Sequence, residues 1–102
     1  MKLNVLERLM LLGMLPAEGN LTTIRIVRGL REDLSFSEAE HEHLKFHTVG
    51  ENLNWQDGAV DDKEFEFGAK ATGIIGDALE KLIEDEKVKE QHLSLFDKFG
   101  VE

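Results

Sequence analysis

The sequence predicts an α+β domain that is mainly helical, with a small antiparallel sheet of two or three strands packed on a long helix. Apolar residues recur every three or four positions in residues 5–34 and 68–89, which is helical spacing. They alternate in short segments between residues 44 and 67, which is typical of strands. With 102 residues, 41% of them apolar, the chain has the size and composition of a single domain, residues 1–102.

The first helix is predicted at about Val5–Leu15. Asn4 precedes it and Glu7 follows three residues later, a variant of the capping box that satisfies the free amides at a helix start. Apolar residues cover most of its circumference, so this helix belongs at the centre of the core or beneath a partner. Pro16 and Gly19 end it.

The second helix is predicted from Thr22 or Thr23 to about Leu34. Its start is rich in β-branched residues, so a strand is the alternative, but the periodic Leu30 and Leu34 favour the helix. The segment also carries a basic stripe of three arginines at intervals of three residues: Arg25, Arg28 and Arg31. Such a stripe contacts phosphates or an acidic partner, or it is a solvated face that pairs with nearby acids.

A second capping box, formed by Ser37 and Glu40, starts a short third helix at Glu38–His43. Strand alternation then follows in three segments: Leu44–Val49, Leu53–Trp55 and Lys63–Phe67.

The strand pattern also predicts which aromatic residues lie in the core. Phe65 and Phe67 share one face of the last strand and are predicted to point inward. Trp55, the single tryptophan, is predicted to lie in the core beside Leu53. If it is exposed instead, it is the first candidate for contact with a partner.

The longest predicted helix is Gly68–Lys89, which has one apolar stripe and an opposite charged face. Gly73 and Gly76 lie inside it, either as tolerated weak positions or as a smooth strip against which another element packs closely. The chain ends with a predicted helix at Gln91–Phe99. Its apolar face consists of Leu93, Phe96 and Phe99, with Leu95 nearby.

The formal net charge of −9 is concentrated in the middle of the chain. Residues 35–67 contain nine acidic residues and two lysines, a charge of −7, whereas residues 1–34 carry +1 and residues 68–102 carry −3. An acidic field repels phosphate backbones and attracts basic partners. The candidate partner-binding residues are therefore Glu38, Glu40, Glu42, Glu51, Asp57, Asp61 and Asp62. The alternative is a solvated acidic surface that maintains solubility.

The sequence contains no recognisable motif for catalysis, a cofactor or a metal, so we expect a protein that is not an enzyme. It has no cysteine, and its serines lack a nucleophile-elbow context. His41, His43 and His47 lie close together, but HEHLKFH is not the HExxH zinc motif, and strand alternation interrupts the helical spacing. The loop around Asp57 lacks the residue spacing of a calcium loop.

The sequence also predicts where the protein resides. Charged residues interrupt any signal-peptide core in MKLNVLERLM, and no apolar run reaches the roughly 18 residues of a membrane helix. We therefore expect a cytoplasmic protein that does not enter a membrane.

The predicted order of helix, helix, short helix and strand–turn–strand resembles a winged helix, in which the third helix reads the major groove of DNA. The matching helix here, Glu38–His43, is acidic. If the analogy holds, the DNA-reading surface has been lost or turned to protein binding.

The segments LNVLERLMLLGMLPAEGN, REDLSFSEAE and EFEFGAKATGIIGDALEKL resemble small acidic proteins of phages and prophages whose function is uncharacterised. That resemblance implies binding to a host or phage protein. Some such proteins inhibit nucleic-acid-binding defence machinery by occupying its basic groove. The resemblance includes no catalytic motif, so it assigns no residue a role.

The leading hypothesis is a small acidic protein-interaction module that binds a basic protein through the acidic middle third. One alternative is a homo-oligomeric structural or assembly protein, with the first helix and the Leu93, Phe96 and Phe99 face buried between copies. The other is a winged-helix-like regulator that binds nucleic acid directly through Arg25, Arg28 and Arg31.

Overall fold

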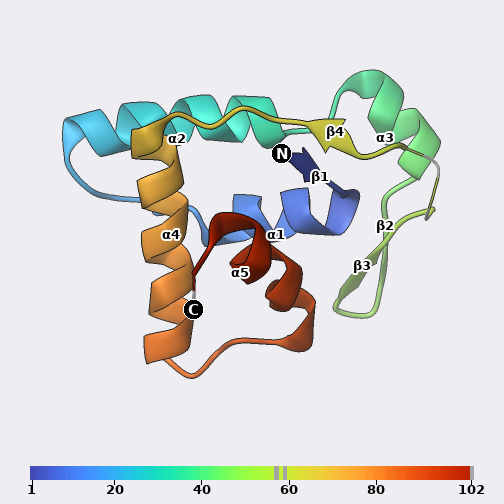
Figure 1. Ribbon diagram of the computed structural model, residues 1–102. Coiled ribbons are helices and arrows are strands. Elements are labelled where there is room, and N and C mark those ends of the chain that lie inside the picture. Colours follow the sequence, from blue (N-terminus) through green and yellow to red (C-terminus); the bar gives the residue numbers. More distant parts are fainter. Residues whose placement is uncertain (57, 59, 102) are drawn as a thin grey trace.

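The computed structural model describes residues 1–56, 58 and 60–101 (Figure 1). Its helices are α1 (Val5–Met14), α2 (Leu21–Leu34), α3 (Glu38–Leu44), α4 (Ala69–Glu84), the 3-10 turn η1 (Glu90–His92) and α5 (Leu93–Phe99). Its strands are β1 (Lys2–Leu3), β2 (His47–Val49), β3 (Asn52–Asn54) and β4 (Lys63–Glu64). The mainly helical α+β class is confirmed, and so is the order of the predicted elements.

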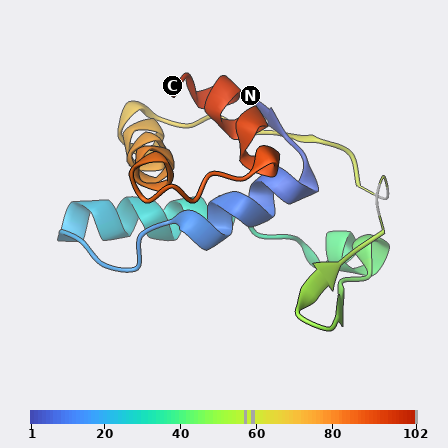
Figure 2. The same ribbon diagram turned by 90° about the horizontal axis from the view of Figure 1, so that it is seen from below.

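The helices form two unequal parts. In Figure 1, α2 crosses the top of the molecule, α4 runs down the left side, and α1 and α5 lie below α2 and to the right of α4. We call these four helices, with β1 and β4, the body. Residues 36–56, which contain α3 and the β2–β3 hairpin, lie at the end away from α4 in both Figure 1 and Figure 2. We call this segment the α3–hairpin arm.

The strands form two separate antiparallel pairs. In the first pair β1 lies beside β4, with Lys2 opposite Glu64. In the second pair β2 lies beside β3, with Thr48 opposite Leu53. The sequence did not predict β1, because a strand of two residues is too short to show alternation. The predicted small sheet is thus divided between the body and the arm.

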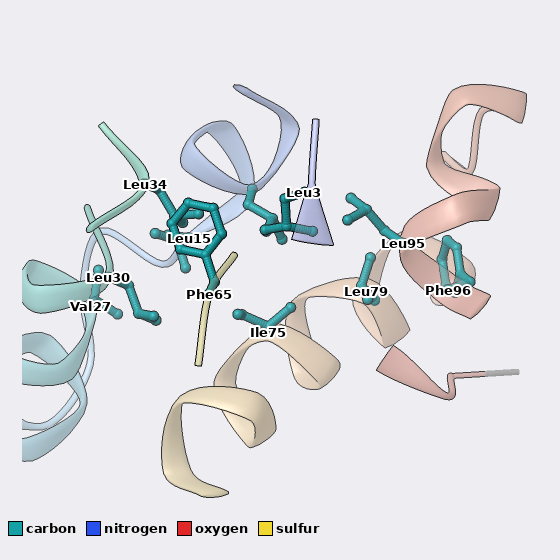
Figure 3. Close-up of a cluster of buried hydrophobic side chains, with 11 residues drawn as sticks. Leu3, Leu15, Val27, Leu30, Leu34, Phe65, Ile75, Leu79, Leu95 and Phe96 are labelled. Carbon is teal, nitrogen blue, oxygen red and sulfur yellow. The ribbon is translucent and has the colours of Figure 1, made fainter. Parts of the chain in front are cut away.

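The core of the body is built from aliphatic side chains of β1, α1, α2, α4 and α5, together with Phe96 of α5 and Phe65, which follows β4 (Figure 3). Its buried members are Leu3, Leu11, Leu15, Val27, Leu30, Leu34, Phe65, Ile75, Leu79, Leu95 and Phe96. Leu79 of α4 and Leu95 of α5 point toward one another in Figure 3. Phe65 follows β4 and is buried as predicted, with Phe67 partly buried beside it.

The start of α2 and the end of α3 differ from the prediction. α2 begins at Leu21 because the Asn20 side chain, rather than a threonine, accepts the Thr23 amide at 2.8 Å. α3 extends through Leu44, which had been predicted to begin a strand. Lys45 ends the helix in the left-handed conformation, with φ of 51°, a role that glycine usually takes and that lysine does not signal.

α4 ends at Glu84, five residues before the predicted end. Glu86 adopts a left-handed φ of 55°, its amide donates to Ile83 O, and the Lys87 amide donates to Leu82 O. This pair of bonds is a Schellman motif, which turns the chain away from the helix axis. The charged residues that follow fit a helix pattern equally well, so the stop is invisible in the sequence.

Three side chains that were predicted to lie on an apolar, core-facing surface are more exposed in the structure. Leu93 is 53% exposed, and Leu95 takes its predicted place in the core beside Phe96. All of these residues lie in α5, where Leu95, Phe96 and Phe99 fall within an arc of about 100°, and Leu93, the first residue of the helix, lies outside that arc. Leu53 is 46% exposed and Trp55 is half-buried, because the hairpin extends from the body instead of packing on α4.

The two internal glycines of α4 are not a packing strip. Apart from adjacent residues and the nearby helix backbone, a Cβ placed on Gly73 would meet no described atom within 4 Å, and one on Gly76 would meet the Val101 side chain at 4.0 Å. This geometry agrees with the interpretation that both glycines are weak positions which the helix tolerates.

Candidate functional site

A buried arginine joins three helices at the base of the α3–hairpin arm. The Arg8 side chain, on α1, is only 1% exposed. Its Nε donates to Leu34 O at 3.2 Å and its Nη2 donates to Ser35 O at 2.7 Å. These carbonyls end α2, where backbone acceptors lack partners within the helix, so Arg8 acts as a C-terminal cap from another element.

The same guanidinium forms an ion pair with Glu40 of α3. Arg8 Nη1 lies 2.6 Å from Glu40 Oε2, and Nη2 lies 3.3 Å from Oε1. The hydrogen bonds from Arg8 lower the pKa of Glu40 to about 2, with further help from the Ser37 amide of the predicted capping box. The guanidinium carbon also lies 4.0 Å from the centre of the Phe36 ring. Arg8 therefore determines where α3 sits.

The seven acidic candidates separate into different groups. Glu40 is held by Arg8 and is not free to meet a partner. Asp57 lies outside the described residues. The other five side chains are exposed: Glu38, Glu42, Glu51, Asp61 and Asp62. They come from α3, the turn of the hairpin and the segment before β4, at the end of the molecule that carries the arm (Figure 1).

Aromatic rings hold the arm together. The Phe46 ring lies 5.2 Å from Phe36, 5.4 Å from His41 and 6.2 Å from Trp55, measured between ring centres. The Gln56 amide donates to Leu44 O at 2.7 Å, which ties the end of the hairpin back to α3. The arm thus presents its acidic residues on a small aromatic scaffold of its own.

The histidines of the arm do not converge. His41 packs against the rings of Phe36 and Phe46, and His47 Nδ1 lies 3.0 Å from Lys45 O. Within residues 1–56, 58 and 60–101, no three histidine, aspartate or glutamate side chains come together in a way that could hold a metal ion.

The basic stripe on α2 is exposed along its length, but two of its arginines have contacts on the protein's own surface. Arg31 donates to Leu12 O and Leu15 O, both at 3.4 Å, at the end of α1. Arg28 Nε lies 3.7 Å from Glu32 Oε1 one turn along the helix. Both contacts are long or solvated, so they restrain these side chains only weakly.

A second buried charge ties the C-terminal helix to α1. The Glu7 side chain is 1% exposed. It accepts hydrogen bonds from Lys98 Nζ at 2.7 Å, Ser94 Oγ at 2.9 Å and the backbone N–H of Asn4 at 3.0 Å. Burial raises the pKa of Glu7, but these hydrogen bonds outweigh burial and leave it below its ordinary value. The predicted capping role of Glu7 is confirmed, and this second role was missed.

One signal in the sequence marks both buried charges. Glu7 and Arg8 are adjacent charges in the otherwise apolar segment VLERLMLLGM. A helix whose apolar residues surround it buries whatever else it carries, and buried charges are paired. The sequence therefore identifies the residues that require partners, but not Glu40, 32 positions later, or Lys98, 91 positions later.

Comparison with protein-family models, with curated proteins and with solved structures gave no match to this chain. In the part of the chain that the structure describes, no helix is both long enough and apolar enough to cross a membrane.

Proposed function

We propose that this protein is a non-enzymatic interaction module that binds a basic protein through five exposed acids. We call these residues, Glu38, Glu42, Glu51, Asp61 and Asp62, the acidic face. The observation that supports the proposal is their common exposure at one end of the molecule. Glu40 lies among them in sequence but is withdrawn into the Arg8 pair, so the acids that remain are the ones a partner would meet.

Electrostatics favours a basic protein over nucleic acid for this surface. Residues 35–67 carry a formal charge of −7, which repels phosphates and accelerates encounter with a positively charged partner. The Arg8–Glu40 pair holds α3 in one position, so its exposed acids require less ordering on binding. The resemblance to small acidic phage and prophage proteins agrees with such a role.

The experiment compares two variants with the same change in charge. The first carries Glu38→Gln, Glu42→Gln, Glu51→Gln, Asp61→Asn and Asp62→Asn. The control neutralises five exposed acids in α4 and in the residues between α4 and α5: Asp77→Asn, Glu80→Gln, Glu84→Gln, Asp85→Asn and Glu90→Gln. A partner is captured in parallel from lysate with and without nuclease treatment and is purified. Its Kd is then measured for each protein at two salt concentrations.

We expect the acidic-face variant to lose binding and the control to retain most of it, with affinity that falls as salt rises. Equal weakening of both variants would show that only total charge matters. Capture that requires nucleic acid would contradict the proposal directly.

A second candidate function is direct nucleic-acid binding through Arg25, Arg28 and Arg31, because all three are exposed on α2. Replacing all three with glutamine should then abolish a strongly salt-dependent affinity for nucleic acid. Self-assembly has less support. Phe96, which belongs to its expected interface, is instead buried in the protein's own core. A monomeric mass at high concentration would count against it.

A further inference from the structure

A hollow of about 420 Å³ opens beside the acidic face, between the start of α1 and the segment that follows the hairpin. Its lining includes Val5, Leu6, Trp55, Val60 and Asp62. Trp55 and Asp62 are candidate contact residues in the sequence for separate reasons, and the fold places them around the same space. Trp55 is half-buried, with its ring 6.2 Å from Phe46, so it is held in place while remaining accessible.

Five of the lining residues offer three kinds of surface, and Asn4 and Gly58 complete the lining. Val5, Leu6 and Val60 provide half-buried aliphatic walls, Trp55 provides an aromatic ring, and Asp62 provides an exposed carboxylate. Aliphatic walls suit the stem of a long side chain, an aromatic face attracts a cation, and a carboxylate pairs with one. The ligand that needs all three at once is a long side chain ending in a positive charge.

We propose that the Trp55–Asp62 pocket receives an arginine side chain of the basic protein that binds the acidic face. The inference rests on the proposed function and specifies where a side chain of the partner binds. Arginine fits better than lysine because a planar guanidinium stacks on an indole ring and offers two N–H groups to one carboxylate, whereas an ammonium is a strongly hydrated point charge.

The start of α1 also lines this pocket, and a helix start carries a partial positive charge that opposes a cation. The α1 cap reduces it, because its two hydrogen bonds satisfy free amides at the helix start. The Glu7 carboxylate accepts the Asn4 amide at 3.0 Å, and the Asn4 side chain accepts the Glu7 amide at 2.8 Å. Because Lys98 Nζ lies 2.7 Å from Glu7 Oε1 and balances its charge, the attraction for a cation comes from Asp62 and from the formal charge of −7 over residues 35–67.

The chain provides its own reporter for this test. Trp55 is the single tryptophan and there is no tyrosine, so intrinsic fluorescence reports on the pocket wall. The probes are three short peptides in which glycine alternates with arginine, with lysine, or with citrulline, the neutral counterpart of arginine. Each is titrated into the full chain at low salt, with Trp55 emission and calorimetry recorded together.

Two variants separate the pocket from the wider acidic face. Asp62→Asn removes the carboxylate that lines the pocket, and Asp61→Asn removes an identical charge from the adjacent exposed residue, which does not line it. We expect the arginine peptide to shift Trp55 emission and to bind more tightly than the lysine peptide. We expect Asp62→Asn to weaken binding about fivefold and Asp61→Asn less than about twofold, as for a well-oriented ion pair against a diffuse one. Asp62→Glu should recover most of the affinity.

Several outcomes would contradict the proposal that this pocket binds an arginine side chain. Equal weakening by Asp61→Asn and Asp62→Asn, with Trp55 emission unchanged, would place the arginine elsewhere on the acidic face and leave the proposed function standing. Equal affinity for the citrulline peptide would show that no cation is recognised, and equal affinity for the lysine peptide would remove the guanidinium preference. If no peptide binds, the pocket is excluded, and the five-acid variant decides the proposed function separately.

Discussion

The body and the α3–hairpin arm are stabilised in different ways. The body buries eleven apolar side chains in one cluster, whereas Leu44 alone is fully buried among residues 36–56, and it lies outside that cluster. The arm relies instead on the Arg8–Glu40 ion pair and on four aromatic rings. A segment with so little buried apolar surface keeps one position only while its polar anchor is intact.

The difference between the body and the arm also explains why similar acidic residues have different roles. Glu7 and Glu40 face arginine or lysine in protected positions, so their charges stabilise the fold. Glu38 and Glu42 lie beside Glu40 in sequence but point to solvent, so their charges are available to a partner. The arm can therefore carry a binding surface without contributing to the core of the body.

The largest expected effect comes from removing the anchor. Arg8→Met should lower the free energy of unfolding by about 4 kcal/mol, because it removes the cation beside Glu40 and leaves the last carbonyls of α2 without their donor. Urea denaturation measures this. The control is Arg28→Met, which removes an exposed arginine and should cost less than about 0.5 kcal/mol. Similar stabilities for the two variants would show that Arg8 is not the anchor.

Leu44→Ala should separate the two regions. Removing the buried leucine of the arm should cost about 3 kcal/mol locally, since it leaves a cavity with few neighbours to fill it. Trp55 fluorescence reports on the arm and far-ultraviolet circular dichroism reports mainly on the helices of the body. We expect the fluorescence transition to move to lower urea while the dichroism transition moves less. Coincident transitions would mean that arm and body unfold as one unit.

Acid should weaken the anchor in a defined pH window. Because the pKa of Glu40 is about 2 in the folded protein and near 4.5 ordinarily, the unfolded chain binds more protons between these values. The stabilisation is complete above about pH 4.5 and is lost as pH falls through 2, so about 2 kcal/mol disappears between pH 6 and pH 3. Urea denaturation across this range should show a shallower loss for Glu40→Gln than for the matched Glu42→Gln.

The smallest expected effect lies in the body. Lys98→Met should lower the free energy of unfolding by about 1 kcal/mol, because Glu7 keeps its bonds to Ser94 and the Asn4 amide. Hydrogen exchange should show faster opening of α5, which Lys98 joins to α1. Lys87→Met, an exposed position after α4, is the control. A loss as large as that of Arg8→Met would show that the core does not compensate for a broken ion pair.

Much of the fold could be predicted because its signals are local. Both predicted capping boxes form, and the helical segments appear within a few residues of their expected bounds. The predicted ends of α3 and α4 were wrong because Lys45 and Glu86 adopt a left-handed backbone conformation that their residue types rarely take. The sequence predicted that acidic residues form the candidate site. It could not predict which of them are exposed, because exposure depends on contacts between distant segments.

The sequence by itself determined the helical and strand segments, the capping residues and the concentration of negative charge in the middle third. These depend on residues a few positions apart, whose spacing decides which face of an element is apolar. Only the tertiary structure decided that Arg8 pairs with Glu40, that Glu7 pairs with Lys98, and that Trp55 and Asp62 line one pocket with the start of α1. Those contacts join segments remote in the chain, and a buried charge is stable only where folding delivers its partner.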